Sequence, residues 1–128
     1  MKLLLDTHTA LWLFNEHEKL SPIARDYLLE ESNALYISIV SAWEVAIKTS
    51  LGKLGNLKGG VKIFLHAIDS HPIEVLPISA QYLELVEALP FIHRDPFDRL
   101  IIATAISENM SIITTDENIQ KYNVSVVW

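Results

Sequence analysis

The chain has 128 residues, a formal net charge of −6 and no cysteine, and half of its residues are hydrophobic. This length suits one hydrophobic core, so we expect a single domain spanning residues 1–128. The hydrophobic content excludes a disordered chain, the lack of cysteine excludes disulfides and thiolate chemistry, and the negative charge disfavours a nucleic-acid partner.

The first half of the chain predicts two strands and four helices. Ser21 followed by Pro22 is typical of a helix N-terminus, and hydrophobic spacing places the other elements. The glycine-rich segment 52–60 holds all four glycines of the chain and predicts a flexible connection. The predicted elements are a strand at 2–5, helices at 7–14 and 22–31, a strand at 34–39, a helix at 40–53 and a helix from about Val61.

The second half continues the alternation with three strands and two helices. The predicted elements are a strand at 73–78, a helix at 80–89 capped by Ser79, a loop at 90–96, a nearly all-apolar helix at 98–108, and strands at 111–115 and 124–127. Strands that alternate with helices favour a parallel sheet covered on both faces. The predicted fold class is therefore α/β, a three-layer α/β/α sandwich with a central, mainly parallel sheet.

No segment of the sequence is typical of a membrane protein. The apolar segment 100–106 is short, the segment 34–47 is interrupted by serines and Glu44, and a membrane span needs roughly 18 apolar residues. The N-terminus reaches Asp6 too early for a signal peptide. We therefore expect a cytoplasmic protein with no membrane contact.

Two acidic residues follow predicted strands directly. Asp6 comes after Leu3–Leu5, and Asp116 comes after the strand that ends at Thr115. Ligands of parallel sheets bind at the carboxyl ends of the strands. Both carboxylates are therefore expected at the same edge of the sheet, where they can converge.

Two further acids interrupt apolar helix faces. Glu44 shares its face with Val40 and Ile47, and Asp98 shares its face with Ile101 and other apolar residues. Both side chains are expected to point inward, toward the core.

Each acid also has a purely structural interpretation. Asp6 can cap the following helix, residues 41–44 match a capping box, Asp95 with Pro96 can open a helix, and Asp116 can form an Asx turn. A cap, however, need not face a core, so the four acids together favour a functional cluster over four unrelated caps.

A cluster of carboxylates requires a cation. Two carboxylates about 4 Å apart repel by roughly 4 kcal/mol at an effective dielectric constant near 20. Mg²⁺ or Mn²⁺ is the expected partner of oxygen ligands. The five histidines show no paired metal-ligand spacing and are interpreted as surface or packing residues, with His93 the least certain. Such a metal site favours hydrolysis of a phosphodiester.

Four ordered motifs support this interpretation through a family resemblance. The motifs are Leu4-Leu5-Asp6-Thr7-His8, the segment from Ser38 to Lys48 with Ser41-Ala-Trp-Glu44, the segment from His93 to Ala103 with Asp95-Pro-Phe-Asp98, and Ile113-Thr-Thr-Asp116. Together they resemble PIN-domain proteins of the VapC type, the toxins of bacterial toxin-antitoxin pairs. The resemblance covers the whole length of the chain.

The resemblance implies a function and a site. It implies an endoribonuclease whose Mg²⁺ or Mn²⁺ is held by an acidic quartet, here Asp6, Glu44, Asp98 and Asp116, with Asp6 and Asp98 the strongest ligand candidates. It also implies a homodimer, a cognate antitoxin protein and an RNA substrate. The residues expected to orient the acids or water are Thr7, Ser38, Asp95 and Thr115 (or its neighbour Thr114).

Basic residues suggest where RNA would bind. Four of the ten Lys and Arg residues lie within residues 45–68, a segment without Asp or Glu. Such a segment can form a local basic face on an acidic protein, although a solvated helix end and loop is the alternative interpretation. The candidates are Lys48, Lys53, Lys58 and Lys62.

Two other functions fit part of the pattern. A haloacid-dehalogenase-type phosphatase also has an aspartate after its first strand, but it needs a second aspartate where this chain has His8. A non-catalytic PIN-like binding module would normally lack one or more of the acids, and all four are present here.

Overall fold

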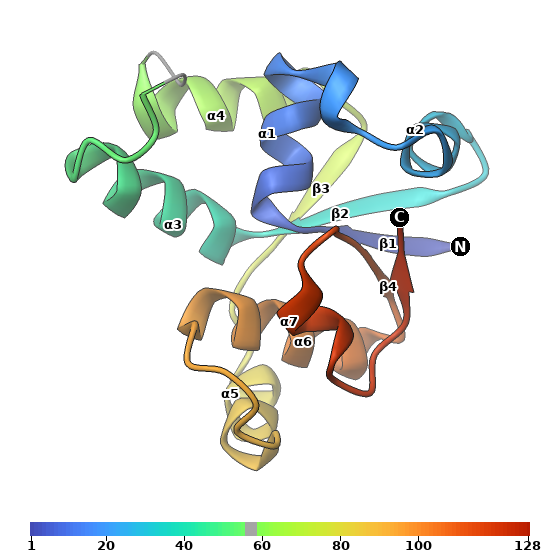
Figure 1. Cartoon of the computed structure of the whole chain (residues 1–128), viewed down its shortest axis with the longest axis vertical. Coiled ribbons are helices and arrows are strands. Elements are labelled where there is room, and N and C mark those ends of the chain that lie inside the picture. The colour runs from blue at the N-terminus through green and yellow to red at the C-terminus, as the bar shows by residue number, and fades with distance from the viewer. Residues whose placement is uncertain (56–58) are drawn as a thin grey trace.

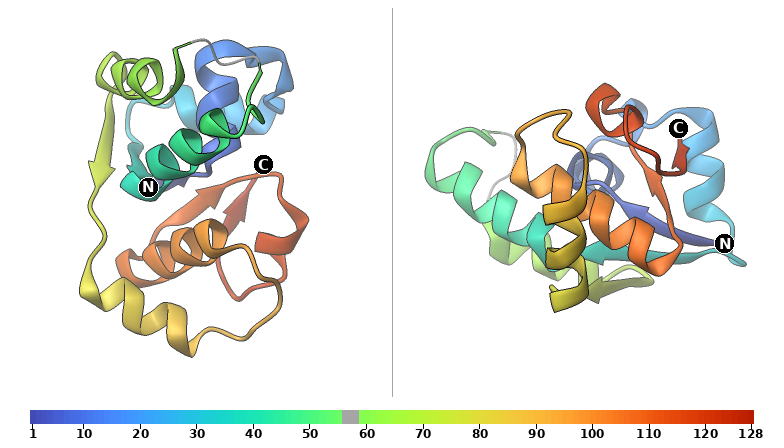
Figure 2. Two further views of the ribbon diagram at one scale, coloured as in Figure 1. Left: turned by 90° about the vertical axis from the view of Figure 1, so that its left-hand side faces the viewer. Right: turned by 90° about the horizontal axis from the view of Figure 1, so that it is seen from below.

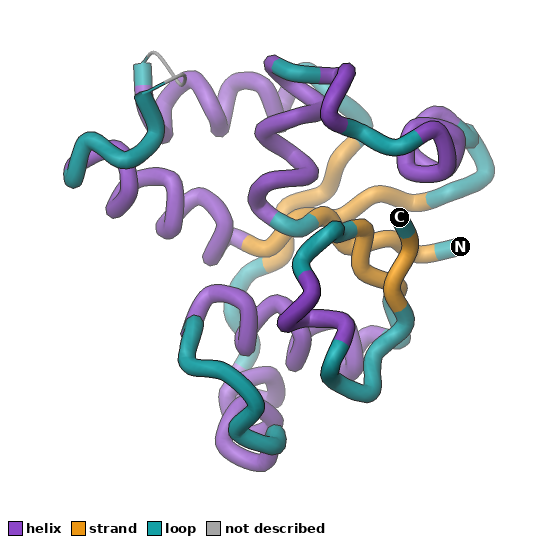
Figure 3. Tube along the Cα trace, viewed as in Figure 1, coloured by secondary structure: helices purple, strands orange, loops and turns teal. Residues whose placement is uncertain are grey.

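The computed structural model describes residues 1–55 and 59–128. Figures 1 and 3 show short strands enclosed by helices. The strands are β1 (Lys2–Leu5), β2 (Ala34–Ser38), β3 (Ile73–Leu76), β4 (Ser111–Ile113) and β5 (Val126–Val127). The helices are α1 (Thr7–Asn15), the 3₁₀ helix η1 (His17–Lys19), α2 (Pro22–Leu29), α3 (Ile39–Ser50), α4 (Gly60–Asp69), α5 (Ala80–Ala88), α6 (Pro96–Glu108) and α7 (Glu117–Gln120).

The five strands form one parallel sheet in the order β3-β2-β1-β4-β5. The chain first builds outward from β1 through β2 to β3, and then returns to place β4 on the other side of β1. The strand order therefore reverses between β1 and β4. In sheets of this kind a ligand binds at that reversal, outside the carboxyl ends of the strands.

Helices cover both faces of the sheet, which confirms the predicted α/β/α sandwich. In Figure 1, α1, α2 and α4 lie above the strands, and α5, α6 and α7 lie below them. The two views of Figure 2 show the same two layers from other sides.

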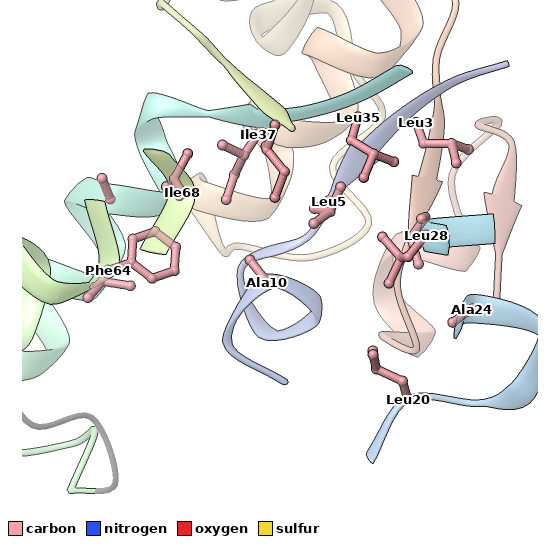
Figure 4. Close-up of a cluster of buried hydrophobic side chains, with 14 residues drawn as sticks. Leu3, Leu5, Ala10, Leu20, Ala24, Leu28, Leu35, Ile37, Phe64 and Ile68 are labelled. Carbon is pink, nitrogen blue, oxygen red and sulfur yellow. The ribbon is translucent and has the colours of Figure 1, made fainter. Parts of the chain in front are cut away.

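Alternation along the strands sends side chains into two hydrophobic clusters. Leu3, Leu5 and Ile113 belong to the cluster on the α1 and α4 side, shown in Figure 4, whereas Leu4 and Ile112 belong to the cluster beneath α6. All five side chains are fully buried. Burying each of them contributes about 1.5–3 kcal/mol to folding, so the strands bind both layers together.

Several element boundaries differ from the predicted ones. The helix expected to reach Lys53 ends at Ser50, and the strand expected at 111–115 ends at Ile113. The predicted helix at 98–108 begins two residues earlier, because Asp95 caps it and Pro96 occupies its first turn. Neither η1 nor α7 was predicted, since both are too short to show a helical repeat. Finally, no helix in the described part of the chain is long and apolar enough to cross a membrane.

Candidate active site

Asp6 stands where β1 ends and α1 begins. Its Oδ1 accepts a hydrogen bond from the Thr7 backbone N–H over 2.7 Å, so it caps α1, as the structural interpretation predicted. Its Oδ2 accepts a hydrogen bond from Thr114 Oγ1 over 2.8 Å, across the strand-order reversal. The side chain alternates with Leu5 and therefore faces the same side of the sheet as Leu4 and α6. Asp6 is thus both a helix cap and a buried acid at the predicted ligand site.

Thr114, and not Thr115, supplies the hydroxyl at this edge. The Thr114 side chain is fully buried, and its Oγ1 also accepts a hydrogen bond from the Asp116 backbone N–H over 3.0 Å. Thr115 is exposed, so of the two threonines that the resemblance offered, Thr114 is the one that reaches Asp6. The reason is the alternation of side chains: Thr114 continues the pattern of Ile112 and faces α6, whereas Thr115 is directed away.

Asp98 enters the site from α6. The N-cap Asp95 accepts hydrogen bonds from the backbone N–H groups of Phe97 and Asp98 over 2.9 and 3.1 Å, and this fixes the first turn of the helix. The Asp98 residue is only 7% exposed. Asp95 therefore acts as the predicted cap, and it places the carboxylate of Asp98 against the sheet edge.

Glu44 enters from α3 and is 3% exposed. Lys48, one turn along the helix, donates a hydrogen bond to its Oε2 over 2.5 Å. Its Oε1 is buried and has no hydrogen-bond partner among the described residues. An unsatisfied carboxylate oxygen of this kind is costly unless a cation or a donor reaches it.

Ser38 is the N-cap of α3, where its Oγ accepts a hydrogen bond from the Val40 backbone N–H over 3.1 Å. The capping box expected at residues 41–44 is therefore absent, because Ser41 lies inside the helix. Ser41 instead accepts a hydrogen bond from Thr7 Oγ1 over 2.9 Å. This bond ties the start of α1 to α3, and so ties the segment of Asp6 to that of Glu44.

Asp116 completes the set from the segment that follows β4. Its Oδ1 accepts a hydrogen bond from the Asn118 backbone N–H over 2.8 Å and caps α7. The residue is only partly buried. Of the four acids, Asp116 is therefore the one with the readiest access to solvent.

The electrostatics of Asp98 indicate that the other acids lie within range of its charge. Burial raises the pKa of Asp98 to about 8, and the negative charges of Asp6, Asp95, Asp116 and Glu44 contribute to the same shift. Burial likewise raises the pKa of Asp6; hydrogen bonds from Thr114 and Thr7 and the nearby His8 oppose this shift, and the charge of Glu44 adds to it. Paired carboxylates with raised pKa values are typical of functional sites.

Lys48 places a positive charge beside the acids. Burial alone would lower its pKa, but the hydrogen bond and charge of Glu44, together with Asp95 and Asp98, raise that pKa above its ordinary value. Lys48, a candidate for RNA binding from the sequence, therefore stays charged beside the acids. Lys53 and Lys62 are exposed beyond it, and Lys58 lies outside the described residues.

His93, which the sequence placed beside the site as the least certain of the five histidines, contacts one of the acids. Its Nε2 lies 3.1 Å from Asp98 Oδ2, and its side chain is 12% exposed. It is neither a surface residue nor simple packing, which corrects the expectation. The signal was its position five residues before Asp98 in the segment His93-Arg-Asp-Pro-Phe-Asp98.

The carboxylate oxygens of the four acids suit a hard divalent cation as ligands. In this structure, however, the four carboxylates are not arranged around one point. Within residues 1–55 and 59–128, no three Asp, Glu or His side chains are grouped closely enough to hold one ion. The free Oε1 of Glu44 and the mutual repulsion at Asp98 nonetheless match what Mg²⁺ or Mn²⁺ would relieve. Lys48 holds the carboxylate of Glu44, and His93 separately holds that of Asp98.

Comparison with known proteins identifies the family. Residues 3–124 match the PIN domain, and the chain belongs to the PIN domain family. The sequence is 29% identical over 120 residues to Ribonuclease VapC22 of Mycobacterium tuberculosis, covering 93% of this chain and 90% of that protein. The predicted resemblance to PIN domains of the VapC type is therefore confirmed.

Solved structures share the fold. The complex of VapBC2 from Rickettsia felis with a DNA fragment from its promoter contains a chain with a TM-score of 0.73 and 19% identity, over 98% of this chain and 97% of that one. DNA-bound VapBC from Salmonella typhimurium gives a TM-score of 0.67 and 18% identity, over 98% and 96% of the two chains. VapBC-1 from Haemophilus influenzae gives 0.64 and 20%, over the same shares. At these identities the likeness shows the fold alone.

Proposed function

We propose that this protein is a metal-dependent endoribonuclease whose catalytic acids are Asp6, Glu44, Asp98 and Asp116. One observation carries the proposal: the charges of Asp6, Glu44 and Asp116, from three other segments, all act on buried Asp98, and buried Glu44 Oε1 has no hydrogen-bond partner among the described residues. A structural role alone would not need an unsatisfied carboxylate oxygen in the same place as a carboxyl with a pKa of about 8. Similarity to Ribonuclease VapC22 supports RNA as the substrate class.

Mg²⁺ or Mn²⁺ is the proposed cofactor, held first by Asp6 and Asp98, with Glu44 and Asp116 completing the set. When bound, the ion activates water and stabilises the leaving oxygen of the phosphodiester. To bind it, the carboxylates must draw together from the separate positions described above. Asp98 must also lose its proton, so metal binding and proton release are coupled.

The residues around the acids have distinct proposed tasks. Thr114 and the Thr7 backbone N–H orient the two oxygens of Asp6, while Asp95 and Ser38 fix the helix starts that carry Asp98 and Glu44. Fixing the backbone that carries each acid limits how far the carboxylates must move to bind the ion.

The proposed RNA path runs along α1 and the segment after α3. Lys53, His8 and Trp12 line a cavity of about 230 Å³ there, and His8 acts electrostatically on Asp6. Lysines bind the phosphate backbone, and an aromatic side chain can stack on an unpaired base. Lys62 extends the path onto α4, whereas Lys48 belongs to the acidic cluster itself. Lys58 stays a proposed RNA contact from the sequence and lies outside the described residues.

We also propose a protein partner and an assembly. The structural relatives are VapBC complexes, and this favours a cognate antitoxin that covers the acidic site. An unregulated ribonuclease in the cytoplasm, its proposed compartment, would be toxic to the cell that makes it. A homodimer is proposed on the family resemblance. We further propose that residues 1–128 form a single domain.

The test is expression of the wild type and of Asp6→Asn and Asp98→Asn in a bacterial host, followed by mapping of cleaved RNA ends. The wild type should arrest growth and create new 5′ ends, and each variant should lower cleavage by orders of magnitude with the fold retained, because asparagine is nearly isosteric. Wild-type cleavage by both variants would overturn the assignment of the acids. Absence of cleavage by the wild type would instead favour a non-catalytic binding module.

A further inference from the structure

A chain of hydrogen bonds runs from the core to Asp98. Arg99 Nη1 lies 3.0 Å from Tyr122 Oη, Tyr122 Oη lies 2.8 Å from His93 Nδ1, and His93 Nε2 lies 3.1 Å from Asp98 Oδ2. Arg99 and Tyr122 are 6% and 4% exposed. The chain of hydrogen bonds therefore begins at buried Arg99 on α6 and ends at Asp98, one of the proposed metal ligands.

The donors and acceptors of this chain can be assigned. Arg99 carries only donors, so Tyr122 Oη accepts from it. Tyr122 Oη also accepts from the His93 backbone N–H over 3.3 Å. With both lone pairs used, the phenol hydrogen is left for His93 Nδ1, which then accepts it. The ring hydrogen of His93 consequently resides on Nε2 and is donated to Asp98 Oδ2.

Arg99 is itself held in one place. Its guanidinium donates to the carbonyl oxygens of Pro90 and Val86 over 3.0 and 3.1 Å, and it lies over the Phe91 ring at 4.7 Å. These contacts fix the segment before α6, which carries His93, relative to α5. The orientation of the histidine ring is thus set by hydrogen bonds to Tyr122 and, through it, to Arg99.

We infer that His93, oriented by Tyr122 and Arg99, is a positioning residue that holds Asp98 Oδ2, so that Asp98 Oδ1 would be the oxygen that binds the metal. The inference rests on the proposed function, because it takes Asp98 as a ligand. Carboxylate ligands are commonly held by a second hydrogen-bonding group, and loss of such a group typically weakens metal affinity about 10–100-fold. Sequence reasoning assigned none of these three residues a role at the site.

The experiment measures Mn²⁺ affinity by titration calorimetry in the absence of RNA. Tyr122→Phe keeps the ring but removes the hydroxyl, and His93→Ala removes the donor to Asp98; each should weaken Mn²⁺ binding about 10–100-fold. His93→Gln, whose amide nitrogen can take the place of Nε2, should recover most of the affinity. In the His93→Ala background, Tyr122→Phe should cost nothing further, because Tyr122 acts through His93.

The matched control is Tyr82→Phe. Tyr82 is 5% exposed, belongs to the same hydrophobic cluster, and donates a hydrogen bond to Glu108 over 2.7 Å, remote from Asp98. Loss of the Tyr82 hydroxyl should lower the melting temperature without changing Mn²⁺ affinity. A ¹⁵N-detected spectrum of the histidine rings supplies a second readout: His93 should carry its hydrogen on Nε2 in the wild type and in Tyr82→Phe, and lose that preference in Tyr122→Phe.

Asp98→Asn separates the two proposals. If Asp98→Asn abolishes Mn²⁺ binding while His93→Ala and Tyr122→Phe bind as the wild type does, the positioning role is overturned and the metal site stands. If Asp98→Asn itself binds Mn²⁺ with wild-type affinity, the proposed metal site fails. Equal losses in Tyr122→Phe and Tyr82→Phe would mean that general loosening of the core, and not the hydrogen-bond chain, changes the affinity.

Discussion

Thr114 donates a hydrogen bond to Asp6 over 2.8 Å, and this bond joins β1 to the end of β4 at the reversal of strand order. The hydroxyl does two things at once. It donates to a buried carboxylate oxygen of Asp6, and it accepts a hydrogen bond from the Asp116 backbone N–H.

Thr114→Val should therefore weaken both the fold and the site. A buried acceptor that loses its donor costs about 1–3 kcal/mol, which urea unfolding would measure, and Mn²⁺ affinity should fall as well. Thr9→Val is the control, because Thr9 Oγ1 is also buried and donates over 2.6 Å to the Ile113 carbonyl oxygen, a backbone group that also accepts from the Asp6 N–H, and not to an acidic side chain. If the two variants bind Mn²⁺ equally well, Thr114 serves folding alone.

The raised pKa of Asp98 predicts how stability depends on pH. The folded protein keeps a proton up to about pH 8 that the unfolded chain loses near pH 4, so metal-free stability should fall between these values. The slope from this group reaches up to roughly 1 kcal/mol per pH unit. Thermal melts in chelator across that range would measure it, and the slope should diminish in Asp98→Asn.

Bound Mn²⁺ should oppose this loss of stability at higher pH. Because Mn²⁺ must displace the proton of Asp98, its affinity should rise with pH up to about 8 and then level off. At 100 times its dissociation constant the ion should add about 2.7 kcal/mol of stability. A melting temperature that is the same with chelator and with saturating Mn²⁺ would contradict the metal site.

Lys48→Met should separate the metal-free protein from the metal-bound one. Without Lys48 the buried carboxylate of Glu44 has lost its cation, so the metal-free protein should be destabilised, by about 3–5 kcal/mol at most because Lys48 is partly exposed. The same change leaves both oxygens of Glu44 free, so the stabilisation gained on adding Mn²⁺ should be larger than in the wild type. Calorimetric melts with and without Mn²⁺ give both numbers, and an unchanged gain would argue against Glu44 as a ligand.

Lys53 and Lys62 should affect RNA binding and not the chemical step. Changing both to Gln should raise KM and flatten its salt dependence, with little change in kcat, since fewer counterions are released on binding. Lys2→Gln with Arg25→Gln makes the same charge change at the amino end of β1 and on α2. If both pairs alter the salt dependence equally, the effect reflects net charge and not an RNA path.

The strands, the layers and the placement of acids at the ends of β1 and β4 could be predicted from the sequence because they follow from short-range patterns. Leu3–Leu5 is apolar on both faces, as a central parallel strand must be, and Asp6 ends it at the ligand-binding edge. The structural and functional interpretations of Asp6 and Asp116 were offered as alternatives, yet each residue caps a helix through one oxygen. A cap uses only part of a carboxylate, so the sequence alone could not have separated them.

The contacts that depend on long-range geometry could not be predicted. Whether Thr114 or Thr115 meets Asp6 depends on the register of β4 against β1, which differs by one residue between the two possibilities. The approach of Tyr122 to His93 joins residues 29 apart in the sequence through the turn after α7. A contact between residues so far apart in the sequence cannot be predicted from a local sequence pattern.

The bond between Thr114 and Asp6 spans 108 positions of the sequence. A ribosome must therefore synthesise almost the whole domain, and the emerging segment must clear the exit tunnel, before the two ends of the site can meet. Nascent chains that stop short of β4 retain Asp6, Glu44 and Asp98 but lack the strand that brings Thr114 and Asp116 to them. Chains truncated before β4 therefore lack both Thr114 and Asp116, so the arrangement around Asp6 described here requires a nearly complete chain.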